Sequence, residues 1–256
     1  MKLAFFLSHP IQYYSPWFRR LAGLLDLHVY YFVKQDPKGQ AQAGFGVEFD
    51  WDVPLLDGYT YTFLKNRASN PSISRFWGAN TPEVKEICRK QRFDAAVLVG
   101  WNRWSAWQTI HACHRAGTPI LMRGDSILEP GRPLRRSLKY LPYRALLPRL
   151  SEHLYVGQRN REYLRHYGVP EKRLHFVPHF VDDDWFGARA RDARQAGVAA
   201  AIRSKLRIPQ DATVALYCGK FVPRKRPADI VDACRICLGA NSNCEIHVIM
   251  VGDGPL

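Results

Sequence analysis

Apolar runs of strand length alternate with helical patterns along this chain. The strand candidates are "KLAFFL" (2–7), "LHVYYFV" (27–33), "AAVLVG" (95–100), "TPILMR" (118–123), "HLYVG" (153–157), "LHFVP" (174–178), "TVALYCG" (213–219) and "EIHVIMVG" (245–252). Helical patterns lie near 16–25, 82–91, 103–116, 135–148, 158–167 and 227–239. The strand runs are continuously apolar, as expected for strands that are buried on both faces. The pattern therefore predicts an α/β fold with a parallel, doubly wound sheet.

The pattern restarts after a polar segment rich in Ala and Arg, in which 188–206 are predicted to form one helix. We expect an N-terminal Rossmann-like domain over 1–181, a linker over 182–210 and the start of a second Rossmann-like domain over 211–256. The second domain has 256 − 210 = 46 residues. An independent domain usually has roughly 100 residues or more, so we interpret the chain as a fragment.

The charge is strongly basic and unevenly spread. The chain of 256 residues has 37 Lys and Arg against 23 Asp and Glu, a formal net charge of +14. Residues 131–210 hold 17 − 7 = +10 of this excess, which indicates an anionic partner. Within them, 132–150 carry six basic residues, no acidic residue and a partly apolar stripe of leucines. This pattern is typical of a helix on an anionic membrane surface, and a solvated basic face is the alternative.

No apolar run approaches the roughly 18 residues of a membrane span. The five apolar residues Leu3 to Leu7 are fewer than the roughly 7–15 of a signal-peptide core. We therefore expect a cytoplasmic protein, with peripheral association at the inner face of the membrane through 132–150.

The six cysteines are Cys88, Cys113, Cys218, Cys234, Cys237 and Cys244. "CRIC" (234–237) is spaced like half of a zinc site, which Cys218 and Cys244 would complete. The alternative is a buried helix face, because apolar residues recur with Cys234 and Cys237 at helical spacing. We favour the buried face and predict no metal and no cofactor.

The stretch "YCGKFVPRKRPADIVDA" (217–233) carries the chemistry of the second domain. Gly219 permits a turn at the end of a strand, and Lys220 and Lys225 then precede a helix. Cationic side chains beside a helix N-terminus suit the oxygens of a diphosphate. A solvated basic turn is the alternative.

This stretch and the later "IHVIMVGDGPL" (246–256) resemble the opening of the donor domain in GT-B glycosyltransferases, specifically the retaining family 4 type. "FVPHFVDDDWF" (176–186) is similar to the interdomain signature of that family, with His179 and Phe180 in place of the usual Asn and Gly. The resemblance implies a GT-B fold and a metal-independent transfer. It also implies a later acidic element, E-x7-E, beyond the end of this sequence.

The resemblance assigns residues to the nucleotide-sugar donor. Gly219, Lys220 and Lys225 would bind its diphosphate, where the lysines would neutralise charge on the departing phosphate. Gly252 and Gly254 would line the nucleotide pocket.

The first domain offers candidates at the carboxyl ends of its strands, where ligands of parallel sheets bind. His9, in the loop after the first strand, is a candidate general base, and a structural hydrogen-bonding role is the alternative. Gln12 and Tyr13 of the same loop are candidate acceptor contacts, although Tyr13 could equally serve packing.

Two further strand ends complete the candidate list. Asp125 is the second catalytic candidate, and Arg123 is expected on the acceptor side. In "GWNRWSAW" (100–107), Asn102 is predicted to cap a helix, and the tryptophans are interpreted as core residues or a sugar platform.

We therefore predict a retaining glycosyltransferase that moves a sugar from a nucleotide-sugar to an acceptor such as a lipid-linked or polysaccharide precursor. One alternative is a nucleotide-sugar 2-epimerase on the same fold, which would need no acceptor. The other is a non-catalytic basic module that binds membrane or nucleic acid. Only charge supports that module, and the sequence has no RNA-binding signature, so nucleic acid is not expected as a partner.

Overall fold

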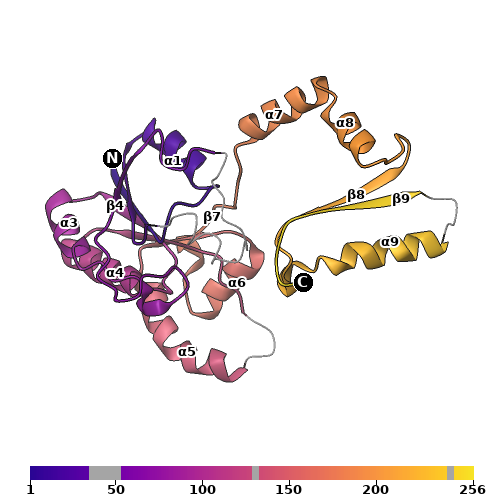
Figure 1. Ribbon diagram of the computed structural model, residues 1–256. Helices are drawn as coiled ribbons and strands as arrows, with labels where there is room; N and C mark the ends of the chain where they lie inside the picture. The colour runs from indigo at the N-terminus through magenta and orange to yellow at the C-terminus, as the bar shows by residue number, and fades with distance from the viewer. Residues whose placement is uncertain (35–52, 129–132, 241–244) are drawn as a thin grey trace. The chain divides into compact units, whose positions relative to one another are not determined.

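The computed structural model describes residues 1–34, 53–128, 133–240 and 245–256, with the backbone alone for 133–136. The described residues form two compact units (Figure 1). Unit 1 extends to Val181, and unit 2 begins at Asp182.

A parallel sheet forms the centre of unit 1, with seven strands among the described residues (Figure 1). The strands are β1 (Lys2–Leu7), β2 (Asp26–Tyr31), β3 (Thr60–Phe63), β4 (Ala95–Val99), β5 (Ile120–Gly124), β6 (Glu152–Tyr155) and β7 (Leu174–Phe176). Their order is β3-β2-β1-β4-β5-β6-β7, and all neighbouring pairs are parallel. The predicted parallel α/β sheet is confirmed. The apolar-run pattern misses β3, because this short edge strand is half exposed and every second residue is a threonine.

Helices cover both faces of this sheet. They are α1 (Ser15–Ala22), η2 (Phe76–Gly78), α3 (Val84–Gln91), α4 (Trp104–Ala116), α5 (Pro133–Leu146), η3 (Leu147–Arg149), α6 (Gln158–His166) and η4 (Glu171–Arg173). Successive residues of β1 enter different cores. Phe5 packs on Phe18 of α1 with ring centroids 4.8 Å apart, whereas Phe6 belongs to the cluster that contains Cys88 and Cys113 of α3 and α4. Burial on both faces explains the continuous apolar runs in the sequence.

The strand order reverses direction between β1 and β4. From β1 the chain moves outward through β2 to β3, and it then returns to β4 and proceeds to β7 on the other side. The loops after β1 and β4 therefore diverge. Such a switch point leaves a crevice at the carboxyl ends of the strands, where ligands bind in open α/β sheets.

Unit 2 consists of helices and a two-stranded parallel sheet. Its elements are α7 (Asp183–Gln195), α8 (Val198–Lys205), β8 (Thr213–Cys218), η5 (Pro223–Lys225), α9 (Ala228–Ala240) and β9 (Ile246–Val251). The prediction of one helix over 188–206 is wrong, because the helix ends at Gln195 and a new one begins at Val198. Between them, Gly197 adopts a φ of +64°, a conformation that interrupts a helix and favours glycine.

The predicted buried face of α9 is also wrong. Val231 and Leu238 are 40% and 41% exposed, Cys237 is exposed, and no residue of the helix is buried. Cys244 of the zinc alternative lies outside the described residues. Within the described ranges, no group of three or more His, Cys, Asp or Glu side chains is arranged to hold a metal ion.

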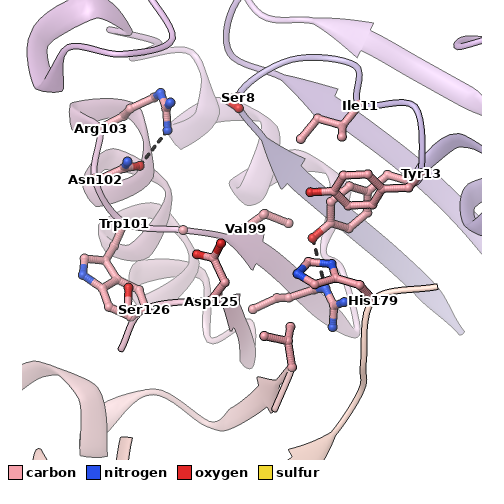
Figure 2. A pocket seen from close by; sticks show the side chains of 15 residues that line it. Ser8, Ile11, Tyr13, Val99, Trp101, Asn102, Arg103, Asp125, Ser126 and His179 are labelled. Carbon is pink, nitrogen blue, oxygen red and sulfur yellow. Dashed lines mark hydrogen bonds between the residues drawn. The ribbon is translucent and has the colours of Figure 1, made fainter. Parts of the chain in front are cut away.

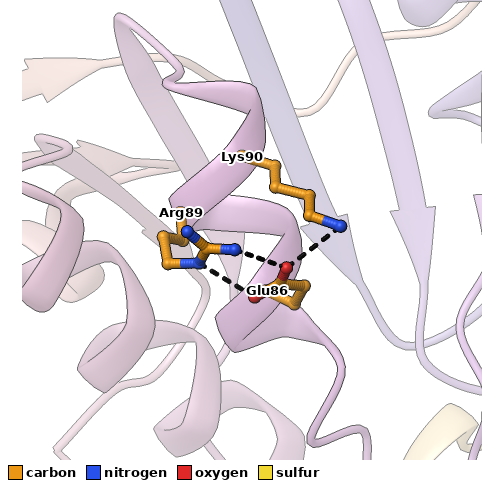
Figure 3. Close-up of polar contacts among 3 residues, drawn as sticks. All are labelled: Glu86, Arg89 and Lys90. Carbon is orange, nitrogen blue, oxygen red and sulfur yellow. Dashed lines mark hydrogen bonds and ion pairs between the residues drawn. The ribbon is translucent and has the colours of Figure 1, made fainter.

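The solvent face of α3 carries a small ion cluster (Figure 3). The Glu86 carboxylate lies 2.7 Å from Arg89 and 3.0 Å from Lys90. Hydrogen bonds from Arg89 and then Lys90 lower the pKa of Glu86 to about 2. These side chains are well solvated, so the cluster contributes little to stability.

Candidate functional site

A pocket of about 220 Å³ lies at the switch point of unit 1 (Figure 2). Its walls come from the loop after β1, the loop 100–103 after β4, the segment 123–126 at the end of β5, Val156 after β6, and His179. The carboxyl ends of four parallel strands thus form one concave surface. This is where the topology predicts a ligand.

Three of the predicted site residues line this pocket, namely Tyr13, Arg123 and Asp125. In Figure 2, the carboxylate of Asp125 lies near the middle of the pocket, with Arg103 on one wall and Tyr13 on the opposite wall. Partial burial, together with Tyr14 and Asp125, raises the pKa of Tyr13 to about 12. Tyr13 therefore keeps its proton and can donate a hydrogen bond, while Asp125 can accept one.

Arg123 also lines the pocket, but its donors are engaged within the protein. It is 1% exposed, and its Nε donates to the Tyr14 hydroxyl at 3.0 Å. Its two terminal nitrogens donate to the carbonyls of Val177 at 2.7 Å and Pro178 at 3.0 Å. These bonds hold the segment that ends in His179 against the end of β5, so Arg123 fixes the shape of the pocket.

His9 and Gln12 are not among the residues that line the pocket. The Nδ1 atom of His9 lies 2.8 Å from the Ser8 hydroxyl, which does line it. Burial and then the charge of Arg103 lower the pKa of His9 to about 4. The ring is therefore neutral at pH 7, and it supports the wall behind Ser8.

Sequence reasoning missed Arg103 and His179. Arg103 donates from Nη1 to Asn102 Oδ1 at 2.6 Å, and its buried Nε has no hydrogen-bond partner among the described residues. The prediction that Asn102 caps a helix is wrong. Arg103 occupies the N-cap position of α4, and its side chain makes no capping hydrogen bond. His179 packs against Tyr13 with ring centroids 5.4 Å apart. The sequence held a signal for both, since His179 directly follows a predicted strand end and Arg103 lies three residues after another.

Buried hydrogen bonds hold the pocket loops in place. The Gly100 amide donates to the Arg123 carbonyl at 2.8 Å and ties the ends of β4 and β5 together. Asn160, 3% exposed, donates to the Ser126 carbonyl at 2.7 Å and accepts from the Val156 amide at 3.2 Å. Side chains on such fixed loops are preorganised for a ligand.

The predicted diphosphate residues lie on one turn of unit 2. The turn follows β8 through Gly219 and continues through η5 to α9. Burial lowers the pKa of Lys220, and the charges of Arg224 and Lys225 lower it further. Three cations are thus close enough to repel one another, and a bound anion would relieve that repulsion.

Gly252 and Gly254 lie beside this turn, where the two backbone segments approach too closely for a side chain. The Gly219 amide donates to the Val251 carbonyl at 2.9 Å, and the Phe221 amide donates to the Asp253 carbonyl at 2.9 Å. A Cβ atom at Gly252 would overlap the Gly219 carbonyl, and one at Gly254 would overlap the Phe221 carbonyl. Their φ angles of +152° and +156° also favour glycine. The proposed role in a nucleotide pocket stays a prediction.

The fold of this chain is that of GT-B enzymes that use nucleotide sugars. The chain resembles Anabaena Alr3699/HepE, solved in complex with UDP, with a TM-score of 0.58 and 14% identity over 100% of this chain and 62% of that one. It also resembles the Neisseria meningitidis UDP-GlcNAc 2-epimerase bound to UDP-GlcNAc, with a TM-score of 0.50 and 10% identity over 98% of this chain and 66% of that one. At these identities the likeness concerns the fold.

A curated relative is a glycosyltransferase. The chain is 28% identical over 189 residues to the D-inositol 3-phosphate glycosyltransferase of Streptomyces avermitilis. The match covers 72% of this chain and 38% of that protein. No protein-family model matches. These findings confirm the predicted resemblance to GT-B glycosyltransferases, whereas family 4, retention and the substrates stay predictions.

Proposed function

We propose that this chain belongs to a retaining glycosyltransferase that moves a sugar from a nucleotide-sugar to a glycan or lipid-linked acceptor. The observation that carries the proposal is the basic turn after β8, in a chain related to a glycosyltransferase. Unit 2 would supply the donor half-site, and unit 1 would supply the acceptor half-site.

In the donor half-site, Lys220 and Lys225 bind the diphosphate. They precede α9, whose N-terminus adds a partial positive charge. During transfer, the bond between the anomeric carbon and the phosphate oxygen breaks, and the diphosphate gains negative charge. The lysines stabilise this charge without a metal ion.

In the acceptor half-site, Asp125 accepts a hydrogen bond from an acceptor hydroxyl beside the attacking one, and Tyr13 donates one to a neighbouring oxygen. The attacking oxygen forms the new bond to the anomeric carbon. Its proton is transferred to the departing diphosphate, so that atoms and charge balance. Asp125 and Tyr13 orient the acceptor for this step.

Calorimetric titration of the chain tests the donor half-site. UDP, GDP and ADP and their hexose conjugates are titrated into wild type, Lys220→Ala and Lys225→Ala. A charge-assisted contact contributes about 1.5–3 kcal/mol, so each variant should bind at least about tenfold more weakly. Arg235→Ala, which removes an exposed cation of α9, is the control. Wild-type affinity in both lysine variants would refute the assignment.

Product analysis separates the proposal from its alternatives. A retaining transferase gives a glycoside with the anomeric configuration of the donor, which the anomeric proton coupling in NMR reports. The fold shared with a 2-epimerase keeps that alternative open, and turnover of UDP-GlcNAc without acceptor would favour it. Salt-dependent RNA binding without any nucleotide-sugar binding would favour the non-catalytic module.

A further inference from the structure

A group of aromatic rings lies at the surface of unit 1. It consists of Phe76 and Trp77 of η2 and Trp104, the first residue of α4, and is here named the aromatic cluster. The rings of Phe76 and Trp77 are 4.9 Å apart between centroids, and those of Trp77 and Trp104 are 5.3 Å apart. Trp77 is 68% exposed, which is unusual for the largest apolar side chain.

The loop that carries Phe76 and Trp77 is held by many hydrogen bonds. The carbonyl of Gly78 accepts from the Ser72 amide at 2.9 Å and from the Asn66 side chain at 3.0 Å. Gly78 is buried, and a Cβ atom there would overlap the Ser72 carbonyl. The backbone of the loop is therefore fixed where it carries the exposed Trp77.

The same loop is tied to α4. The Ser105 amide donates to the Ala79 carbonyl at 3.1 Å, and Gln108 bonds both the Asn80 side chain and the Thr81 amide at 2.9 Å. These bonds fix Phe76 and Trp77 relative to Trp104. The aromatic cluster is thus preorganised, which lowers the entropic cost of binding.

The backbone of the aromatic cluster begins next to the pocket. Trp104 directly follows Arg103 and Asn102, which line the pocket (Figure 2). Consecutive Cα atoms are about 3.8 Å apart, so the backbone at Trp104 lies one residue from the pocket wall. This proximity suits an acceptor of several sugar units, of which one enters the pocket and others lie on the surface outside it.

The chemistry of the surface fits a glycan. The C–H face of a sugar ring is apolar and packs on an indole, while its hydroxyls need polar partners nearby. Polar residues stand next to the rings in the sequence: Ser74 precedes Phe76 by two residues, and Arg103 directly precedes Trp104. Leu138 and Leu141, which are 72% and 75% exposed, belong to α5 and not to the loop that carries the rings. The polar neighbours favour carbohydrate over a lipid surface at the cluster.

We infer that the aromatic cluster binds the glycan portion of the acceptor, one or more sugar units away from the reacting hydroxyl. The inference rests on the proposed function in taking the pocket as the acceptor half-site. It defines the acceptor class as an oligosaccharide rather than a single small alcohol.

Titration with neutral oligosaccharides tests this inference without donor or transfer. Maltohexaose, cellohexaose, mannohexaose and chitohexaose are titrated by calorimetry into the wild-type chain. At least one should bind, Trp77→Ala should weaken it by at least about tenfold, and Trp77→Phe should retain most of the affinity. Leu138→Ala is the matched control for an exposed apolar side chain, and it should bind as wild type does. Unfolding curves of all variants should coincide, since both side chains are exposed.

Three results would overturn the inference. They are no binding of any of the four sugars, equal binding by wild type and Trp77→Ala, and Trp77-dependent binding to phosphatidylcholine vesicles without sugar binding. If oligosaccharides bind through Trp77 but no nucleotide sugar binds, the proposed function fails and the aromatic cluster remains a glycan site. If nucleotide sugars bind and the oligosaccharides do not, the inference alone fails.

Discussion

At the scale of single residues, Arg123 and Arg103 at the carboxyl end of the sheet differ in how many of their donors are already hydrogen-bonded. Arg123 is buried with its donors directed to Tyr14, Val177 and Pro178, so it serves the shape of the pocket. Arg103 has one side-chain partner, Asn102, and a buried Nε without a partner among the described residues. Arg103 is therefore the cation that a ligand in the pocket could meet.

Replacing Arg123 by methionine should destabilise unit 1. The substitution leaves the buried Tyr14 hydroxyl without its donor, which costs about 1–3 kcal/mol. The carbonyls of Val177 and exposed Pro178 also lose their donor but can bond to water, so the total loss is on the order of 2 kcal/mol. Urea denaturation measures it, with Arg115→Met on the exposed end of α4 as the control. If both variants unfold at the wild-type urea concentration, the clamp described for Arg123 does not stabilise the fold.

Protonation of His9 should make unit 1 less stable in mild acid. An unfolded histidine has a pKa near 6.5, whereas burial and Arg103 place that of folded His9 at about 4. The unfolded state therefore takes up the proton first, so stability is complete above about pH 6.5 and is lost as the pH falls toward 4. The loss should be about 1–3 kcal/mol.

The measurement is the free energy of unfolding at pH 7 and pH 4.5 for wild type and His9→Gln. The variant should lose less stability in acid than wild type does. His114→Gln, which changes an exposed histidine of α4, should keep the wild-type pH dependence. Identical acid sensitivity in all three chains would contradict the role given to His9.

At the scale of elements, the turns after β8 and β9 depend on glycine. Replacing Gly252 by alanine should disrupt unit 2, because the new methyl group would overlap the Gly219 carbonyl and separate the two turns. Backbone strain at this φ adds about 1–3 kcal/mol. Gly239→Ala is the control, since nothing lies within 4 Å of its added carbon and helix propensity should improve by up to about 1 kcal/mol.

Circular dichroism and urea denaturation compare the two variants, and a nucleotide titration follows. Gly252→Ala should lose structure and nucleotide affinity together. A folded Gly252→Ala chain that only loses nucleotide affinity would instead indicate that this glycine contacts the ligand directly. Unchanged folding and affinity would contradict both roles.

Whether the sequence predicted an element depends on how much of that element is buried. Strands β1, β4 and β5 lie in the middle of the sheet, so their apolar runs are unbroken and their positions are predicted within a few residues. β3 lies at an edge and is half exposed, and it gives no such run. The single helix predicted over 188–206 is interrupted at Ala196 and Gly197. The alanine-rich pattern around Gly197 hides this interruption in the sequence.

The candidate site was predicted in part for a similar reason. Strand ends are visible in the sequence, so Asp125 and Tyr13 could be assigned to one edge of the sheet. Which side chain turns into the pocket depends on contacts between distant segments. From the sequence, Arg123 could bind a ligand, but in the structure its terminal nitrogens donate to the carbonyls of Val177 and Pro178. His179 follows these two residues and lines the pocket.

At the scale of the whole molecule, the positive charge is concentrated rather than uniform. Between 131 and 210 the excess is 17 − 7 = +10 of a total of +14. The predicted membrane segment 132–150 begins with Arg132, which lies outside the described residues, and continues through α5. No helix among the described residues has the length and apolarity to cross a bilayer.

The surface of α5 supports peripheral membrane binding as a proposal. Leu138 and Leu141 are 72% and 75% exposed, whereas Leu147 and Leu150 are buried, so the predicted leucine stripe is divided between solvent and core. Lys139 and Arg144 lie on the same helix as the exposed leucines. Two apolar side chains with flanking cations can rest on an anionic surface, each cation contributing about 1 kcal/mol.

Binding of the chain to vesicles that contain phosphatidylglycerol should therefore depend on α5, and vesicles without this acidic lipid are the comparison. Wild type should sediment with the acidic vesicles at 0.1 M salt and much less at about 0.5 M salt, because salt screens surface charge. Lys139→Gln/Arg144→Gln and Leu138→Ser/Leu141→Ser should each reduce binding severalfold. Arg191→Gln/Arg194→Gln on α7 removes the same charge from another basic helix and is the matched control. An equal loss in both charge variants would show that net charge, rather than α5, draws the chain to the membrane, and no sedimentation with acidic vesicles would reject membrane association altogether.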